Sequence, residues 1–338
     1  MTYYILFSPL IFDFMLSFSA LFSKALLMFF LCCFALTKSI KAQDIIEVKL
    51  PPLTSAQKLH YIQVYAPIIY MHSKENFFPS SVEFAFEHLI RYQDKHGNYC
   101  VKSKLGLRKP SSIVNYFKGD LESSKIYAFW VDKRDGIKEI SYFIYYPYNR
   151  GKKVLKTLWG NHEGDWEHGT IRFKWKEVDG NLQLLPYEVY LSAHHFGTTA
   201  KWEEVEKENG HPVFYSAKGS HGMYFHEGKY IYQRLVIGKL VDECNKGLKL
   251  NGANSNTIVA FDFRAKKGLK NNAWPNWMRK DFATAGENPE NPSENPIYRW
   301  GTTKERGKAI FLNFYRLSAG PTGPISKALV WDYNNFEK

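Results

Sequence analysis

The segment Glu139–Tyr146, with the sequence EISYFIYY, constrains the fold more than any other part of this chain. Successive side chains of a β-strand point to opposite faces of a sheet, and here both faces are largely apolar. Such a segment predicts a central strand that is covered on both sides and that ends at Pro147. Aromatic residues make up 17% of the chain, and large flat side chains suit a half-buried pleated surface, so further strands are expected.

The other expected elements follow from apolar periodicity and from turn residues. The further strand candidates are Asp165–Trp175, Tyr187–Ala193, Pro212–Ala217, Tyr230–Ile237 and Thr257–Phe263. Helices are expected over Thr54–Val64 and Thr199–Glu208. A third helix is expected after the capping-box pattern at Ser80–Glu83, with one apolar side made of Val82, Phe86, Leu89 and Ile90. The proline-rich stretch 287–296 is expected to be a loop. Together these patterns predict one mainly β domain over residues 43–338, with a few helices at its edges.

The N-terminus has the features of a targeting segment. Residues 1–36 are almost wholly apolar, with Asp13 and Lys24 as their charged residues, and a polar stretch follows. This pattern predicts a secretory signal peptide over residues 1–42 that is cleaved near Ala42, and therefore a secreted, periplasmic or cell-surface protein. The alternative is an uncleaved membrane anchor, for which the run Ala25–Leu36 is short unless residues 1–23 join it.

The remaining chain is basic. The formal net charge of the whole chain is +12, and residues 1–42 contain three lysines and one aspartate, so their removal changes the balance little. A basic surface approaches anionic membranes, glycans and nucleic acid readily. The lysines are spread and no basic motif with base-stacking residues is present, so no nucleic-acid partner is expected. Cys100 and Cys244 follow the signal segment, and they form either one disulfide or two buried thiols.

Chemistry-bearing residues concentrate in Gly160–His168, with the sequence GNHEGDWEH. Residues two apart in a strand share a face, so Asp165 and Glu167 are expected to point the same way at the start of a strand. His162 is expected to reach them from a turn bounded by two glycines. Like charges so close repel unless a cation or a proton lies between them. Oxygen-rich ligation with one imidazole suits Ca²⁺ or Mg²⁺ more than a structural Zn²⁺.

A plainer interpretation of the same segment stays open. The two carboxylates then lie at a strand start and are solvated or paired with lysine and arginine. His168 is expected on the opposite face of the strand and is the poorer ligand candidate.

Two further clusters carry histidines at strand ends. Ser192–His195 contains His194, and Ser216–His221 contains Lys218 and His221. Small residues in the second cluster allow close backbone approach, so Lys218 and His221 are candidates for binding an anionic or sugar group. A single histidine of this kind is more often structural, but three such turns favour a shared site.

The same segments resemble the vacuolar protein sorting-associated protein 62 family. The matching motifs are Tyr65–Pro67, Phe78–Val82, Tyr146–Asn149, His162–His168, Ser192–His194, Tyr215–His221 and Gly320–Pro324. They occur in the family's order and cover nearly all of the chain after the signal segment. Plant members of that family are largely domains of unknown function, and a signal peptide argues against a cytosolic sorting role.

A more distant resemblance is to the necrosis- and ethylene-inducing-like proteins, which are secreted cytolysins. They carry a Gly-His-Arg-His-Asp-Trp-Glu heptapeptide at a strand start, and their fold is a β-sandwich whose divalent cation helps to bind a sphingolipid head group. This resemblance implies a β-sandwich here, with His162, Asp165 and Glu167 as metal ligands and Asn149 at the position of an acidic ligand. Gly164 and Glu163 replace a histidine and an arginine of the heptapeptide, which puts the lipid specificity in doubt.

Two function classes follow. The first is a secreted, divalent-cation-dependent protein that binds glycolipid or glycan on membrane surfaces and resembles a cytolysin or toxin. In it His194, Lys218 and His221 line the ligand site, and Trp166 supports it by packing. The second is a metal-dependent hydrolase of phosphodiesters or esters, in which the cation activates water. No nucleophile elbow and no H-E-x-x-H motif is present, so binding is favoured over catalysis. A purely structural cation is the third alternative.

Overall fold

The computed structural model describes residues 50–104, 115–154, 157–234, 238–278, 297–303, 315–324 and 327. The expected signal peptide and the expected loop at 287–296 lie outside these residues. The chain divides at Pro51 into two compact units, and the second, Pro52–Lys338, holds all the helices and strands described below.

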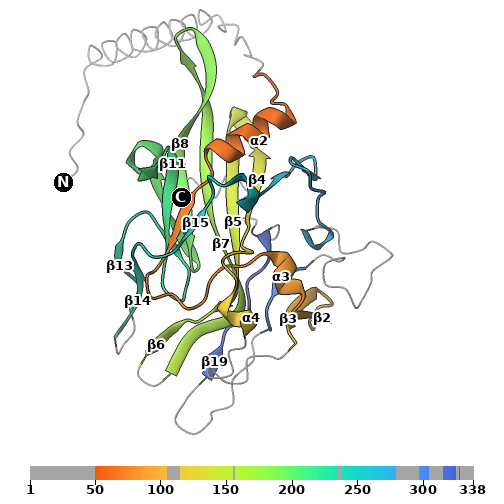
Figure 1. The fold of residues 1–338 in the computed structure, drawn as a ribbon, viewed down its shortest axis with the longest axis vertical. Helices are drawn as coiled ribbons and strands as arrows, with labels where there is room; N and C mark the ends of the chain where they lie inside the picture. Colours follow the sequence, from red (N-terminus) through yellow and green to blue (C-terminus); the bar gives the residue numbers. More distant parts are fainter. Residues whose placement is uncertain are drawn as a thin grey trace, which may run out of the picture. The chain divides into compact units, whose positions relative to one another are not determined.

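The largest sheet in the described residues has nine strands (Figure 1). Its central path runs β17 (Lys267–Gly268), β16 (Ile258–Asp262), β4 (Ile126–Asp132), β5 (Lys138–Asn149), β7 (Thr157–Val178), β8 (Asn181–Ala193) and β9 (Phe196–Lys201). Two short strands, β6 (Lys152–Val154) and β19 (Tyr315–Leu317), also pair with β7. The long strand β7 therefore pairs with four other strands of this sheet, namely β5, β6, β8 and β19.

A second sheet of five described strands packs against the first. It contains β10 (Lys207–Glu208), β11 (His211–Ser216), β1 (Ile68–Met71) and β15 (Lys249–Asn251), with β12 (Met223–Tyr224) beside β11. Two smaller sheets consist of β13 (Gly228–Arg234) with β14 (Lys239–Cys244), and of β18 (Arg299–Trp300), β3 (Tyr99–Ser103) and β2 (Leu89–Gln93). The fold is mainly β and sandwich-like, as predicted.

Two cores lie on the two faces of the nine-stranded sheet. The first contains Ile144 and Tyr146 of β5 together with Phe214 of β11 and Leu250 of β15, so it fills the space between the two sheets. The second is rich in aromatic rings and contains Phe143 and Tyr145 of β5. It is covered by α3 (Val82–Phe86), α4 (Asn115–Lys118) and the sheet that contains β3. The strand β5 is thus buried on both faces, which confirms the prediction made from its sequence.

The helix prediction was correct at one place, correct in its start but too long at a second, and wrong at a third. The helix α2 (Ser55–Val64) matches the expected range, and Thr54 caps it. The helix α3 ends at Phe86, because Leu89 and Ile90 instead pair with β3 in an antiparallel ladder.

The segment Thr199–Glu208 is not a helix. It contains the end of β9, a 3₁₀ turn at Trp202–Glu204 and β10. The physical reason is strand pairing at both of its ends, because residues 199–201 pair with β8 and Lys207–Glu208 pair with β11.

Two boundaries near the candidate site also differ from the prediction. The strand β5 continues through Pro147 to Asn149, because its register passes from Tyr146 opposite Asp165 to Tyr148 opposite Glu163 and needs no pair at the proline. The strand β7 begins at Thr157, so His162 lies within the strand and Asp165 lies well past its start.

Candidate functional site

Asp165 and Glu167 are buried neighbours on one face of β7. Their exposed fractions are 5% and 6%. Their register partners on β5, Tyr146 and Ile144, both belong to the core between the two sheets. The two carboxylates therefore point into the sandwich, on the same face, as the alternation of the strand predicted.

Gly164 allows His162 to join them. Gly164 has φ +64°, in the left-handed region, and a Cβ there would lie 2.5 Å from the carbonyl oxygen of Trp300. The alternation of side chains changes at this glycine, because Glu163 turns to the other face and accepts a hydrogen bond of 3.0 Å from the backbone N–H of Ser103. His162 lies opposite Asn149 on β5, within electrostatic reach of Asp165.

The hydrogen bonds of His162 define its tautomer. Nδ1–H donates to the carbonyl oxygen of Gly164 at 2.6 Å, and Nε2 accepts from the side-chain amide of Asn149 at 2.9 Å. The backbone N–H of Gly151 in turn donates to Oδ1 of Asn149 at 2.8 Å, which fixes the orientation of the amide. Burial lowers the pKa of His162. His162 is therefore a neutral imidazole, and the lone pair on its Nε2 accepts the hydrogen bond from Asn149.

Asp165 is held by His221. Nδ1 of His221 donates to Oδ2 of Asp165 at 3.2 Å, and the ring stacks on Tyr146 with centroids 3.9 Å apart. His221 is fully buried, and its Nε2 has no hydrogen-bond partner within the described ranges. Burial raises the pKa of Asp165, but the hydrogen bond from His221, together with neighbouring groups that include the ammonium of Lys327, outweighs burial, so the pKa is lowered.

Glu167 has the opposite electrostatic situation. Burial, and then repulsion from the charge of Asp165, raise its pKa well above the ordinary value. The hydroxyl of Ser192 donates to Oε2 of Glu167, and the backbone N–H of His168 donates to Oγ of Ser192 at 2.9 Å. Because the two carboxyl groups are buried side by side on one face, it is unfavourable for both to be ionised at once.

Asp242 of β14 organises a second part of the site. Its carboxylate is fully buried, accepts hydrogen bonds from three side chains and forms an ion pair with a fourth. The donors are Nε2 of His194 at 2.7 Å, Oγ of Ser220 at 2.5 Å and the hydroxyl of Tyr224 at 2.8 Å, and Nζ of Lys152 forms the ion pair at 2.9 Å. Burial raises the pKa of Asp242, but these partners outweigh it and lower the pKa to about 2. The charge of Asp242 also raises the pKa of Glu167, so the two parts adjoin.

His194 is placed beside aromatic rings. It has φ +57° at the turn between β8 and β9. Its ring stacks on Tyr232 with centroids 3.7 Å apart, and the centroid of Phe196 is 6.0 Å away. Phe196 is 45% exposed. These three rings form an aromatic patch next to Asp242.

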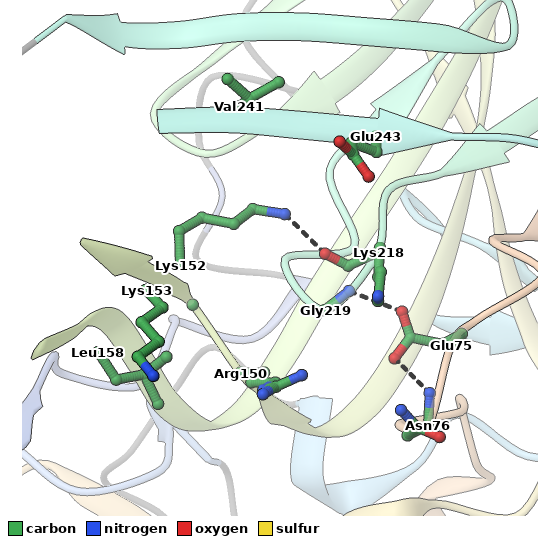
Figure 2. Close-up of a pocket in the computed structure, with 11 residues that line it drawn as sticks. Glu75, Asn76, Arg150, Lys152, Lys153, Leu158, Lys218, Gly219, Val241 and Glu243 are labelled. Atoms are coloured by element: carbon green, nitrogen blue, oxygen red, sulfur yellow. Dashed lines mark hydrogen bonds between the residues drawn. The ribbon is translucent and has the colours of Figure 1, made fainter. Parts of the chain in front are cut away.

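Lys218 lines a separate cavity of about 210 Å³ (Figure 2). The cavity lies between the end of β5, the loop that contains Gly219 and the strand β14. Lys152 borders the same cavity while its ammonium contacts Asp242. The cavity is therefore next to the buried carboxylate of Asp242 but is lined by different side chains.

The structure brings most of the predicted residues together, with one exception. His162, Asn149, Asp165, Glu167 and His221 gather on one face of β7, and His194 and Lys218 lie around Asp242 and the cavity. Trp166 is fully buried in the aromatic core on the opposite face, where its ring stacks on Trp277, so its part in the site is packing.

His168 also lies on the opposite face, as predicted, and its ring stacks on Phe143. Within the part of the chain that the structure describes, no group of three or more His, Cys, Asp or Glu side chains has the arrangement of a metal site.

Sequence reasoning missed Asp242 and Lys152. No motif surrounds Asp242 in the sequence, and only the folding of β14 over the Ala217–Gly222 loop brings it to His194. Cys100 and Cys244 are both buried and form no disulfide, which decides between the two alternatives left open by the sequence. Among the helices in the described residues, none is long and apolar enough to cross a membrane.

Fold and site together define a mainly β protein with a buried carboxylate–histidine cluster on its largest sheet. The family model "Vacuolar protein sorting-associated protein 62" matches residues 109–285, and the chain belongs to this family. The family expected from the motifs is thereby confirmed.

Two relatives in Saccharomyces cerevisiae match the chain. TDA6 is 22% identical over 80% of this chain and 66% of its own length. Vacuolar protein sorting-associated protein 62 is 24% identical over 51% of this chain and 46% of its own length. The chain thus spans about half to two thirds of the length of these relatives.

Two solved structures also match at 14% identity, each over 63% of this chain and 76% of its own. One is described as "Toxin fold for microbial attack and plant defense", with a TM-score of 0.34, and the other as "NLPPya in complex with mannosamine", with a TM-score of 0.33. At these TM-scores the two likenesses support no conclusion about the ligand of this chain.

Proposed function

We propose that this protein is a secreted, divalent-cation-dependent binder of glycan or glycolipid on membrane surfaces, with a cytolysin-like or toxin-like action. The cation is Ca²⁺ or Mg²⁺ and is held by Asp165 and Glu167. The glycan is bound beside it by the aromatic patch of His194, Phe196 and Tyr232.

The pair Asp165 and Glu167 carries this proposal. Each carboxylate uses one oxygen for a hydrogen bond, to His221 and to Ser192 respectively. Among the described residues no hydrogen bond reaches the second oxygen of either. Two carboxylates on one strand face with one available oxygen each, and with a raised pKa at Glu167, favour a divalent cation that replaces the proton.

The residues offer the types of atom that bind such a cation, but not all of these atoms are positioned to coordinate it. Carboxylate oxygens are the ligands that Ca²⁺ and Mg²⁺ prefer. Nε2 of His162 accepts a hydrogen bond from the amide of Asn149, so these two residues can become ligands of the cation only if that hydrogen bond breaks. A bound cation would neutralise the two carboxylates and offer open positions to ligand oxygens.

The aromatic patch supports a sugar ligand. Flat aromatic faces with a few oriented polar groups are typical of sites for small ligands. Asp242 orients the imidazole of His194 through Nε2, and no hydrogen bond from the described residues reaches Nδ1. The basic character of the chain favours approach to an anionic membrane.

The proposal is tested by retention on liposomes. Liposomes that carry glycosylated sphingolipids should retain the wild-type protein with Ca²⁺ and release it with a chelator. Glu167→Gln should abolish this retention, whereas Glu177→Gln, at an exposed position of the same strand, should not. Equal retention on bare and glycosylated liposomes, with or without chelator, would contradict the proposal.

Two histidine–carboxylate pairs favour a second candidate function, a metal-dependent hydrolase of phosphodiesters or esters. His194 with Asp242 and His221 with Asp165 are imidazoles oriented by carboxylates, as in general bases. Turnover of such substrates that His194→Gln removes would support this candidate over binding alone.

A further inference from the structure

We propose that the cavity beside the end of β5 binds a phosphate group, such as that of a phosphorylated sugar or a phospholipid head group. This site is separate from Asp165 and Glu167 and does not require a cation. It therefore goes beyond the proposed function, although a phosphorylated glycolipid could use both.

Four cationic side chains border the cavity. Arg150, Lys152 and Lys153 come from the end of β5 and from β6, and Lys218 comes from the loop before β12 (Figure 2). Lys152 and Lys218 are half-buried, whereas Arg150 and Lys153 are exposed. A ligand that arrives from solvent can therefore contact the two exposed cations first, and the two half-buried cations once it has entered the cavity.

The two carboxylates at the cavity form no ion pair with these cations and neutralise them only in part, since Lys218 is one of the charges that lower the pKa of Glu243. Glu75 accepts backbone N–H groups from Asn76 at 2.8 Å, from Phe77 at 2.9 Å and from Gly219 at 2.6 Å. Glu243 forms its ion pair with Lys229, at 3.1 Å.

Three of the four cations are therefore without an acidic partner. Lys152 contacts Asp242 at 2.9 Å and also donates to the carbonyl oxygen of Lys218 at 2.6 Å. Within the described residues, no carboxylate lies at ion-pair distance from Arg150, Lys153 or Lys218. Because Glu243 is paired with Lys229, these three cations and the single carboxylate of Glu75 leave an excess of positive charge around one cavity of about 210 Å³, and an anion that enters reduces it.

The backbone around the cavity is fixed before any ligand arrives. The N–H of Arg150 donates to the carbonyl oxygen of Gly219 at 2.8 Å, and the N–H of Lys218 donates to that of Glu243 at 3.0 Å. Gly219 has φ +73°, and a Cβ there would lie 3.3 Å from Cβ of Arg150. These contacts join the end of β5 and the strand β14 to the loop that carries Lys218, so little conformational entropy is lost there when a ligand binds.

The number and type of cations favour phosphate over a carboxylate. A guanidinium offers a planar fork of donors to phosphate oxygens, and ammonium groups add point charges. A phosphate monoester carries about two negative charges near neutral pH, which balances the unpaired cations better than one carboxylate does.

Calorimetry with inorganic phosphate, glucose 6-phosphate and phosphatidic acid vesicles tests the proposal, with chelator present throughout. The double variant Arg150→Gln/Lys218→Gln should bind inorganic phosphate about tenfold more weakly or worse, because it lacks two charge-assisted partners. The control Lys95→Gln/Lys176→Gln removes the same charge at exposed positions and should bind as the wild type does. Thermal unfolding of both variants establishes that they are folded.

Several outcomes would overturn the proposal. These are wild-type protein that binds none of the three probes, equal loss in both double variants, or unchanged affinity in Arg150→Gln/Lys218→Gln. Phosphate binding that Glu167→Gln abolishes would also overturn it, because the anion would then depend on the carboxylate site. Retained binding in Glu167→Gln separates this proposal from the proposed function. A preference for glucose 6-phosphate or for the vesicles identifies the source of the phosphate.

Discussion

Nδ1 of His221 lies 3.2 Å from Oδ2 of Asp165, and both side chains are buried between the two sheets of the sandwich. The hydrogen bond from His221 helps to keep the pKa of Asp165 low, whereas burial and then the charge of Asp165 raise the pKa of the neighbouring Glu167. The cluster therefore places a carboxyl group with a lowered pKa and one with a raised pKa on a single strand face. This asymmetry determines how the site responds to pH and to substitution.

Cation binding is predicted to strengthen as pH rises. The raised pKa of Glu167 means that this carboxyl keeps its proton above the usual pH range, and a cation must replace that proton. Affinity should therefore fall as pH decreases through the raised pKa. Calcium titrations at several pH values measure this, and an affinity independent of pH would contradict it.

Asp242→Asn is predicted to destabilise the protein by about 3 kcal/mol near neutral pH, because Lys152 then loses its buried counter-charge. Chemical denaturation measures this loss, and the exposed Asp179→Asn should show little change. The folded-state pKa of Asp242 is lowered from 3.8 to about 2, so its stabilising effect is present above pH 3.8. The difference between wild type and variant should narrow as pH falls from 3.8 toward 2. A difference that is constant over this window would argue against the ionised carboxylate.

Gly164→Ala is predicted to destabilise the protein more than Gly160→Ala. Both glycines have positive φ on the same strand, at +64° and +76°. A Cβ at Gly164 meets the carbonyl oxygen of Trp300 at 2.5 Å, whereas nothing lies within 4 Å of one at Gly160. Positive φ alone costs about 1 kcal/mol, and the steric conflict adds to it at Gly164 only. Equal unfolding free energies for the two variants would contradict this geometry.

His168→Phe is predicted to reduce the acid sensitivity of the fold. Both ring nitrogens of His168 lack partners among the described residues, and burial lowers its pKa well below 6.5. The unfolded chain binds a proton there below pH 6.5 while the folded chain does not, so wild-type stability falls with decreasing pH. Phenylalanine keeps the stacking on Phe143 and has no proton to bind. The slope of unfolding free energy against pH below 6.5 should therefore be smaller in the variant, and an unchanged slope would refute this role.

Local sequence patterns predicted the parts of the fold that depend on neighbouring residues. The two apolar faces of β5 and the shared face of Asp165 and Glu167 follow from strand alternation, which the structure confirms. His162 was placed in a turn because two glycines flank it. They instead have positive φ within the continuous strand β7, since the ladders with β5 and β6 hold the backbone there.

Other features depend on contacts between distant segments and could not be predicted from one sequence. Asp242 reaches His194 only through the packing of β14, 48 residues further along the chain. The cavity that Lys218 lines likewise needs the end of β5 and β14 together. The segment Thr199–Glu208 was predicted as a helix because the strand pairing at its two ends, with β8 and with β11, is tertiary and leaves no local signal in the sequence.

Calcium titration of the whole protein by calorimetry measures whether Asp165 and Glu167 hold a cation. Wild-type protein and Glu177→Gln are predicted to bind one cation with equal affinity near neutral pH. Asp165→Asn and Glu167→Gln are predicted to lose that binding while remaining folded in thermal unfolding. Unchanged affinity in both site variants, or no heat of binding with either Ca²⁺ or Mg²⁺ in the wild type, would contradict the account.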